Sequence, residues 1–404
     1  MRIGRVVRAS TLAATLACAA APAAAQDSDG DTRQGLVEAA QADKLKTLQP
    51  YGQTSMERLM GRLQDILDYQ TITWHPFFGS AAHGSGLPIG VGYLQHVTPY
   101  NFVDVRGSYS VYGYKLAEAE FLAPRLFERR GQLSIVGGWR DATQVGFYGL
   151  GPNSSVDNRA SYGFKEGYGS ALLTVWPTRQ LLMLRGGLEV ARWSPDSARG
   201  TFPPVETAYT PATLPGLDAT ITYTHAQGTV GLDWRPSPGY ARRGGFYAVT
   251  AHDYHDKDDR FGFRQVDYEV VQHFPILRET WVISLRGLAE TTHARDGQDI
   301  PYFLLPHLGG GSTLRGFDSW RFRDGNRLLL QGEWRIMANR FMDTAVFYDA
   351  GKVAPRAGDL GFDNLQHDYG FGARFHTPFQ TALRVEVARS NERTRLVVST
   401  SPVF

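Results

Sequence analysis

One stretch late in the chain combines a run of glycines with a single arginine that is framed by apolar side chains. Gly309 to Gly311 free the backbone to fold back sharply, and Leu314, Arg315, Gly316 and Phe317 follow. A guanidinium is permanently charged and offers a planar fork of N–H donors, so an enclosed arginine needs carboxylate partners. The chemistry that these residues predict is charge-assisted hydrogen bonding, which would hold a segment in place.

Two acidic residues in the segments that follow are candidate partners for Arg315. Residues 326–336 and 342–351 alternate apolar with polar or charged side chains, as β-strands with two different faces do. Glu333 and Asp349 fall on the charged faces of these two segments. If the glycine-rich loop folds inward, we expect Arg315 to pair first with Asp349 and second with Glu333. If the loop stands outside, the pairing does not form.

The same alternation recurs from residue 72 onward, with charged residues of both signs on one face of strand after strand. A soluble sandwich would point its apolar face inward, whereas a membrane barrel turns that face to lipid. Residues after the leader nowhere approach the ~20 consecutive apolar residues of a membrane-spanning helix. We count sixteen strands, with twelve or fourteen as alternatives if terminal hairpins do not join the sheet: 72–79, 87–97, 102–112, 114–123, 131–147, 158–176, 180–193, 218–235, 243–254, 261–274, 280–291, 326–337, 341–352, 367–376, 381–390 and 393–404.

Connections of two kinds alternate along the chain. Short turns that carry proline fall at residues 123–125, 176–179, 235–238, 274–276 and 377–379. Longer connections fall at 149–158, 194–217, 255–260, 293–326 and 354–366. Short periplasmic turns at one end and long extracellular loops at the other are typical of outer-membrane barrels. The sequence therefore predicts an all-β fold, a transmembrane antiparallel β-barrel of residues 72–404.

The chain begins with the pattern of a secretory signal peptide. Residues 1–25 carry three arginines, an apolar run and a final alanine triplet before Gln26. They also contain Cys18, the single cysteine, so cleavage leaves a mature chain without a thiol; a lipoprotein acylated at Cys18 is the alternative. Removal of the leader takes three of 42 basic residues against 40 acidic ones, and this near-neutral balance does not suggest nucleic-acid binding.

Residues 26–71 precede the first strand and form a polar periplasmic arm. A weak helical pattern covers residues 36–48, and Thr54 with Glu57 opens an amphipathic helix that ends near Asp68. We expect its apolar stripe to pack on the barrel, with docking to a partner or to the membrane interface as alternatives.

The loop and strand motifs resemble the BamA/TamA family of outer-membrane barrels, also called the bacterial surface antigen barrel. Leu314-Arg315-Gly316-Phe317 is similar to the family's (Val/Leu)-Arg-Gly-(Phe/Tyr) tip of the sixth extracellular loop. Phe347-x-Asp349-x-Gly351 is similar to its Phe-x-Asp-x-Gly strand. The strands after the loop also match, and the terminal Phe404 resembles the sorting signal read by outer-membrane assembly machinery.

The resemblance implies that Arg315 pairs with Asp349 to hold the loop inside a closed sixteen-stranded barrel. It also implies a seam between the first and last strands that opens sideways to pass polypeptide into the membrane. Family members that fold or secrete proteins usually carry periplasmic POTRA domains of roughly 75 residues, which about 45 residues cannot build. The sequence is therefore similar to a POTRA-less branch, and a separate periplasmic factor would supply the capture of substrate.

From this resemblance we expect insertion or translocation of protein or lipid, with unfolded outer-membrane proteins as substrates and outer-membrane lipids as surroundings. The alternative is a passive pore or structural barrel that the loop plugs. The sequence leaves the oligomeric state open.

Other candidate chemistry has little support. The run from His252 to Asp259 carries histidines and aspartates, but neighbours near a strand end face opposite sides, which favours a solvated loop over a metal site. Residues 147–154 are glycine-rich but lack the Lys-Ser/Thr ending of a phosphate loop. Neither Gly-x-Ser-x-Gly nor His-Glu-x-x-His occurs, which leaves a phospholipase or protease with a dispersed site as the enzymatic alternative. We expect a non-enzymatic protein without metal or cofactor.

Overall fold

The computed structural model describes residues 33–47, 72–179 and 181–404. Helix α1 (Arg33–Thr47) belongs to a different compact unit from the strands and confirms the helical pattern expected there. The amphipathic helix predicted for residues 54–68 and the predicted leader lie outside the described residues. None of the helices described is long and apolar enough to cross a membrane.

Within residues 72–179 and 181–404, a single antiparallel sheet contains sixteen strands, which confirms the predicted strand number. Its strands are hydrogen-bonded in chain order, and only the short β12 (His307–Leu308) and β13 (Phe322–Arg323) pair separately. The strands of the large sheet are β1 (Trp74–Phe77), β2 (Pro88–His96), β3 (Phe102–Ser110), β4 (Lys115–Leu126), β5 (Gly131–Phe147), β6 (Ala160–Val175), β7 (Leu182–Ser197), β8 (Ile221–Asp233), β9 (Gly244–Asp256), β10 (Phe263–Ile276), β11 (Trp281–Ala294), β14 (Asn326–Asn339), β15 (Met342–Ala354), β16 (Gln366–His376), β17 (Thr381–Ser390) and β18 (Thr394–Ser399).

The two faces of the sheet differ as the alternating sequence predicts. On β15, Asp343, Phe347 and Asp349 are buried, whereas Val346 and Tyr348 are 56% and 51% exposed. Charged side chains therefore face the interior and apolar side chains face outward. This is the reverse of a soluble protein and suits a sheet whose outer face meets lipid.

The connections sort by length as expected, but two of the predicted turns lie within strands. Residues 123–125 belong to β4, where Pro124 falls at a shift of register, and residues 274–276 complete β10. The turns follow at residues 127–130 and 277–280. Proline is tolerated at such irregular or terminal strand positions because no ladder hydrogen bond is lost there.

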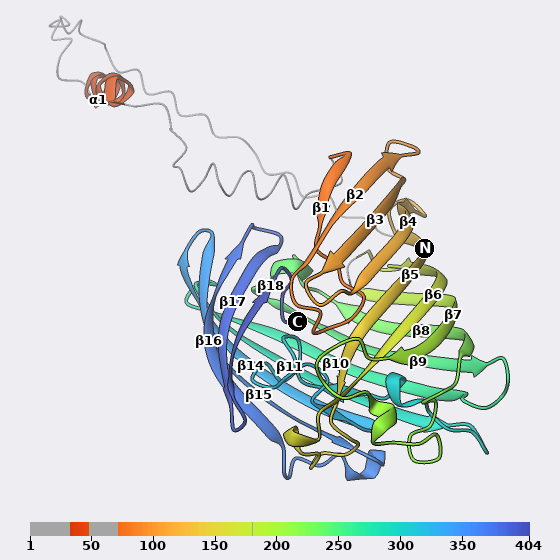
Figure 1. Cartoon of the computed structure of the whole chain (residues 1–404). Coiled ribbons are helices and arrows are strands. Elements are labelled where there is room, and N and C mark those ends of the chain that lie inside the picture. The colour runs from red at the N-terminus through yellow and green to blue at the C-terminus, as the bar shows by residue number, and fades with distance from the viewer. Residues whose placement is uncertain (1–32, 48–71, 180) are drawn as a thin grey trace, which may run out of the picture. The chain divides into compact units, whose positions relative to one another are not determined.

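The first and last strands do not pair with each other among the described residues, so the sheet curls but is not closed by hydrogen bonds. Figure 1 shows β1 and β18 at the two ends of the curled sheet. Both edge strands are shorter than the predicted 72–79 and 393–404. Pro76 lies within β1 and has no N–H to donate, which weakens pairing at that edge. We call the boundary between β1 and β18, which is not closed by hydrogen bonds, the seam.

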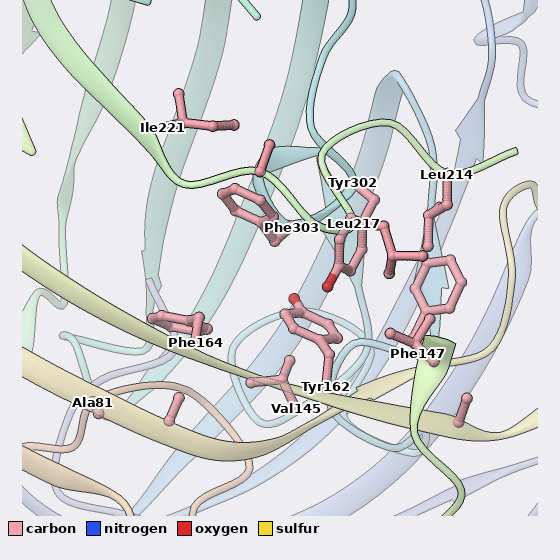
Figure 2. Close-up of a cluster of buried hydrophobic side chains, with 14 of the residues drawn as sticks. Ala81, Val145, Phe147, Tyr162, Phe164, Leu214, Leu217, Ile221, Tyr302 and Phe303 are labelled. Atoms are coloured by element: carbon pink, nitrogen blue, oxygen red, sulfur yellow. The ribbon is translucent and has the colours of Figure 1, made fainter. Parts of the chain in front are cut away.

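Two groups of side chains fill the interior of the barrel, one on the side of the long loops and one on the side of the short turns. On the side of the long loops, Phe147, Tyr162, Tyr302 and Phe303 belong to an aromatic cluster that also includes Leu214 (Figure 2). The rings of Tyr162 and Tyr302 meet edge to face with centroids 4.8 Å apart. These residues come from the strand wall and from two long loops, so the loops pack onto the wall instead of standing in solvent.

On the side of the short turns, the connection between β8 and β9 folds inward, which the sequence did not predict. Its Tyr240 is buried and donates a hydrogen bond to Asp343 on β15 over 2.6 Å. The Tyr240 ring stacks on His376 with centroids 3.8 Å apart, and Thr381 donates to the carbonyl of Gly239. The turn thus reaches across the interior to the opposite wall.

Candidate functional site

The segment between β11 and β14 enters the interior as a folded loop. Strands β12 and β13 pair at its base, and Gly309 and Gly310 follow β12 with φ of 108° and 106°. A side chain at Gly309 would collide with the carbonyl oxygen of Asp318. Glycine is therefore required where the backbone reverses toward Arg315.

Apolar residues on either side of Arg315 fix the loop against the wall. Leu314 and Phe317 are fully buried and belong to one cluster with Leu308, Leu329 and Val353. Burial of such side chains contributes roughly 1.5–3 kcal/mol each. The apolar frame seen in the sequence thus positions the guanidinium by packing.

Arg315 lies in a pocket of acceptors at the middle of the wall. Its Nε and Nη2 donate to the two carboxylate oxygens of Asp349 over 2.6 and 2.7 Å. Its Nη1 donates to Glu386 over 3.0 Å and to Glu333 over 3.3 Å. The guanidinium also lies 3.4 Å from the centre of the Phe347 ring. We call Arg315 with Asp349, Glu333, Glu386 and Phe347 the arginine site.

Electrostatics favour the charged form of Arg315 despite its burial. Burial opposes the charge, but Asp349 above all, and Glu386 after it, raise the pKa of Arg315 above its usual value. Nearby in the same loop, burial, then Arg327 and Arg323, lower the pKa of His307 well below its ordinary value. His307 is therefore neutral at physiological pH and adds no charge to the loop.

The arginine site contains more charged residues than the sequence predicted. Glu386, which alternation placed inward without a partner, accepts from Arg374 over 2.8 Å and from Arg384 over 2.9 Å. Arg374 also donates to Glu333. Alternation identifies the inward face, but the approach of β16 and β17 to the loop depends on the curvature of the sheet.

Two glycines of the motifs are required by close contacts. A Cβ at Gly316 would lie 2.6 Å from Cβ of Asp368 and 3.0 Å from the backbone nitrogen of Ser390. A Cβ at Gly351 would lie 2.7 Å from the carbonyl oxygen of Leu328 on β14 and 3.0 Å from Cδ1 of Leu308 in the loop. The Ser390 hydroxyl donates to the carbonyl of Gly316 over 2.9 Å. Absence of a side chain lets the loop reach the wall at these points.

The same loop contacts both sides of the seam. Toward β18, Asp318 accepts two hydrogen bonds of 3.0 Å from Arg393, and Arg395 donates to the carbonyl of Phe317. Toward β1, the indole Nε1 of Trp320 donates to the carbonyl of His83, in the connection between β1 and β2, over 2.9 Å. We call these contacts the seam bridge. The loop thus links two edges that share no strand hydrogen bonds.

The chain end differs from the predicted strand. Strand β18 ends at Ser399, and the ring of Phe404 lies in the interior beside His273 of β10, with centroids 6.2 Å apart. The alternation of residues 393–404 does not extend as one strand, because residues 400–404 lie beyond the end of β18. The role of Phe404 as a sorting signal stays a prediction.

The histidine- and aspartate-rich run is not a solvated loop throughout. Strand β9 extends to Asp256, and His252 faces the interior, where its Nδ1 lies 3.0 Å from Nε2 of His225. Asp256 is fully buried and accepts backbone N–H groups of the turn, including that of Arg260. Within the described ranges, no three His, Cys, Asp or Glu side chains gather in a metal-binding arrangement.

Two solved structures share this fold. BamA from Haemophilus ducreyi, determined without POTRA domains 1–3, matches with a TM-score of 0.58 and 13% identity over 81% of this chain and 67% of its own. CdiB from Escherichia coli matches with a TM-score of 0.53 and 11% identity, again over 81% of this chain, which spans 59% of CdiB. No family model and no curated protein matches the sequence significantly. At these identities the likeness is one of fold.

Proposed function

We propose that the chain is an outer-membrane barrel that inserts or translocates polypeptide, or lipid, through the seam between β1 and β18. The observation that carries the proposal is the unpaired edge, held on both sides by the loop of Arg315. An unpaired strand edge offers free N–H and C=O groups to an incoming strand, so unfolded outer-membrane proteins are the proposed substrates. The fold shared with BamA supports the same function.

The arginine site has the role of a lock in this proposal. Its buried ion pairs hold the loop at one position along the barrel axis. The contacts of the seam bridge then connect the loop to the two sides of the seam. Residues 26–71 form the periplasmic arm behind the leader, and a separate periplasmic factor delivers the substrate. None of these steps requires chemical catalysis.

A passive, plugged pore is the second candidate. Charged groups of both signs line the interior wall away from the loop, as in the cluster of Arg106 with Asp104, Glu118 and Glu120. Such a wall would suit diffusion of small polar solutes once the loop moved.

Cross-linking across the seam separates the two candidates. Cysteines replace Trp74 and Val398, which lie on the outer faces of β1 and β18, and a flexible bis-maleimide joins them. Insertion of an unfolded outer-membrane protein into proteoliposomes should stop, while any single-channel conductance persists. The matched control joins Ile89 and Tyr109, which are directly paired on β2 and β3, and should leave insertion unchanged. Insertion at the normal rate with a complete seam cross-link would refute the proposal.

A further inference from the structure

The outer face of β5, β6 and β7 carries an apolar groove that the proposed function does not use. The groove has a volume of ≈ 570 Å³, and its lining includes Leu133, Leu173, Leu184 and Leu188. Leu184 and Leu188 are 39% and 64% exposed, so the groove opens away from the interior. Gly186 lies between them, and a Cβ there would meet nothing within 4 Å. Because Gly186 has no side chain, the surface is open at this position and forms part of the groove.

An arginine stands on the same face, displaced from the groove toward the long loops. Arg192 follows Leu188 by four residues on β7, which corresponds to ~13 Å along a strand, and it is exposed. Within the described ranges, its guanidinium forms no hydrogen bond or ion pair. Gly167 lies opposite Arg192 and Gly169 opposite Val190, so the surface between arginine and groove has low relief.

The charges around Arg192 leave this face positive. Lys165 pairs with Asp196 over 2.9 Å, and Arg199 pairs with Asp141. Lys115 adds a further positive charge 3.8 Å from Asp141. The two carboxylates are therefore already matched by basic side chains, and Arg192 remains available to an anion from outside the chain.

We propose that this face binds a phosphorylated glycolipid of the leaflet beside the long loops. Its phosphate is held by Arg192, and one of its acyl chains occupies the groove beside Gly186. A guanidinium binds phosphate oxygens in a bidentate manner, and a charge on a lipid-facing strand is tolerated only near the headgroup level. Arg192 and the groove therefore match the two ends of one amphiphilic ligand. The site is independent of the seam.

Native mass spectrometry of the purified full-length protein tests the site. Micelles are doped in turn with diphosphoryl lipid A, phosphatidylglycerol and phosphatidylcholine, and the fraction of protein that retains lipid is measured. Wild-type protein should retain diphosphoryl lipid A most strongly. Arg192→Gln should weaken retention about tenfold, and Gly186→Leu, which fills the groove in open space, should weaken it similarly.

The matched control is Arg264→Gln on β10, because Arg264 is 71% exposed on the outer face but lies away from the groove. This variant should retain lipid A as wild type does. Heat-dependent electrophoretic mobility confirms that each variant is folded. Equal retention by wild type and Arg192→Gln would overturn the site, and preferential retention of phosphatidylglycerol would overturn the choice of glycolipid.

Discussion

At the scale of single residues, Arg315 and Asp349 do not depend on each other equally. Without Asp349, Arg315 keeps Glu386 at 3.0 Å and Glu333 at 3.3 Å as acceptors. Without Arg315, the carboxylate of Asp349 keeps the amide of Gln331, at 3.2 Å, but no cation within hydrogen-bond distance among the described residues. A buried carboxylate that loses its cation is more costly than a guanidinium that keeps two partners.

A double-mutant cycle on this pair should show that asymmetry. Arg315→Ala should lower the free energy of unfolding by about 3–5 kcal/mol, Asp349→Ala by less, and the double change by little more than Arg315→Ala. The measurement is the temperature at which the folded barrel loses its distinct electrophoretic mobility. Arg264→Gln breaks an exposed pair and should cost about 0–1 kcal/mol. Fully additive losses would contradict the direct pairing.

At the scale of elements, sequence alternation predicted sixteen strands and, for the most regular of them, which face turns inward. It assigned Glu333 and Asp349 to the charged faces of two regular strands, and in the structure both accept hydrogen bonds from Arg315. It could not predict the inward turn that carries Tyr240, since that contact joins segments far apart in the chain and follows from sheet curvature. The short β1 and β18 also escaped prediction, because pairing at an edge depends on a partner strand that alternation does not identify.

The loop between β11 and β14 should hold the two sides of the seam together through the seam bridge, whose contacts are separate from the arginine site. Trp320→Leu removes the hydrogen bond from this loop to the carbonyl of His83 but leaves the four acceptor contacts of Arg315 intact. Spin labels on β1 and β18 should then show a broader distance distribution, while the heat resistance of the barrel changes little. Trp139→Leu on the outer face of β5 is the matched control. An unchanged distribution would mean that the seam bridge does not hold the edges.

At the scale of the whole barrel, three groups of buried contacts join inward-folded segments to the strand wall, and we expect each of them to obstruct the interior. The aromatic cluster around Tyr302 lies on the side of the long loops, the arginine site at the middle, and the turn of Tyr240 on the side of the short turns. Each is anchored to the wall by buried contacts. Opening any one of them leaves two others across the same path.

Conductance in planar bilayers should therefore show whether these contacts close the interior of the barrel to ions. Wild-type protein should give no steady conductance, because ions would have to cross all three obstructions. Replacing residues 309–319 by a short Gly-Ser linker should give only brief openings, since the turn of Tyr240 still closes one end. Combining that replacement with Tyr240→Gly, which removes the hydrogen bond to Asp343 and the stacking on His376, should lengthen the openings. Large and steady wild-type currents would contradict this expectation, because they would show that the interior contacts do not close the path.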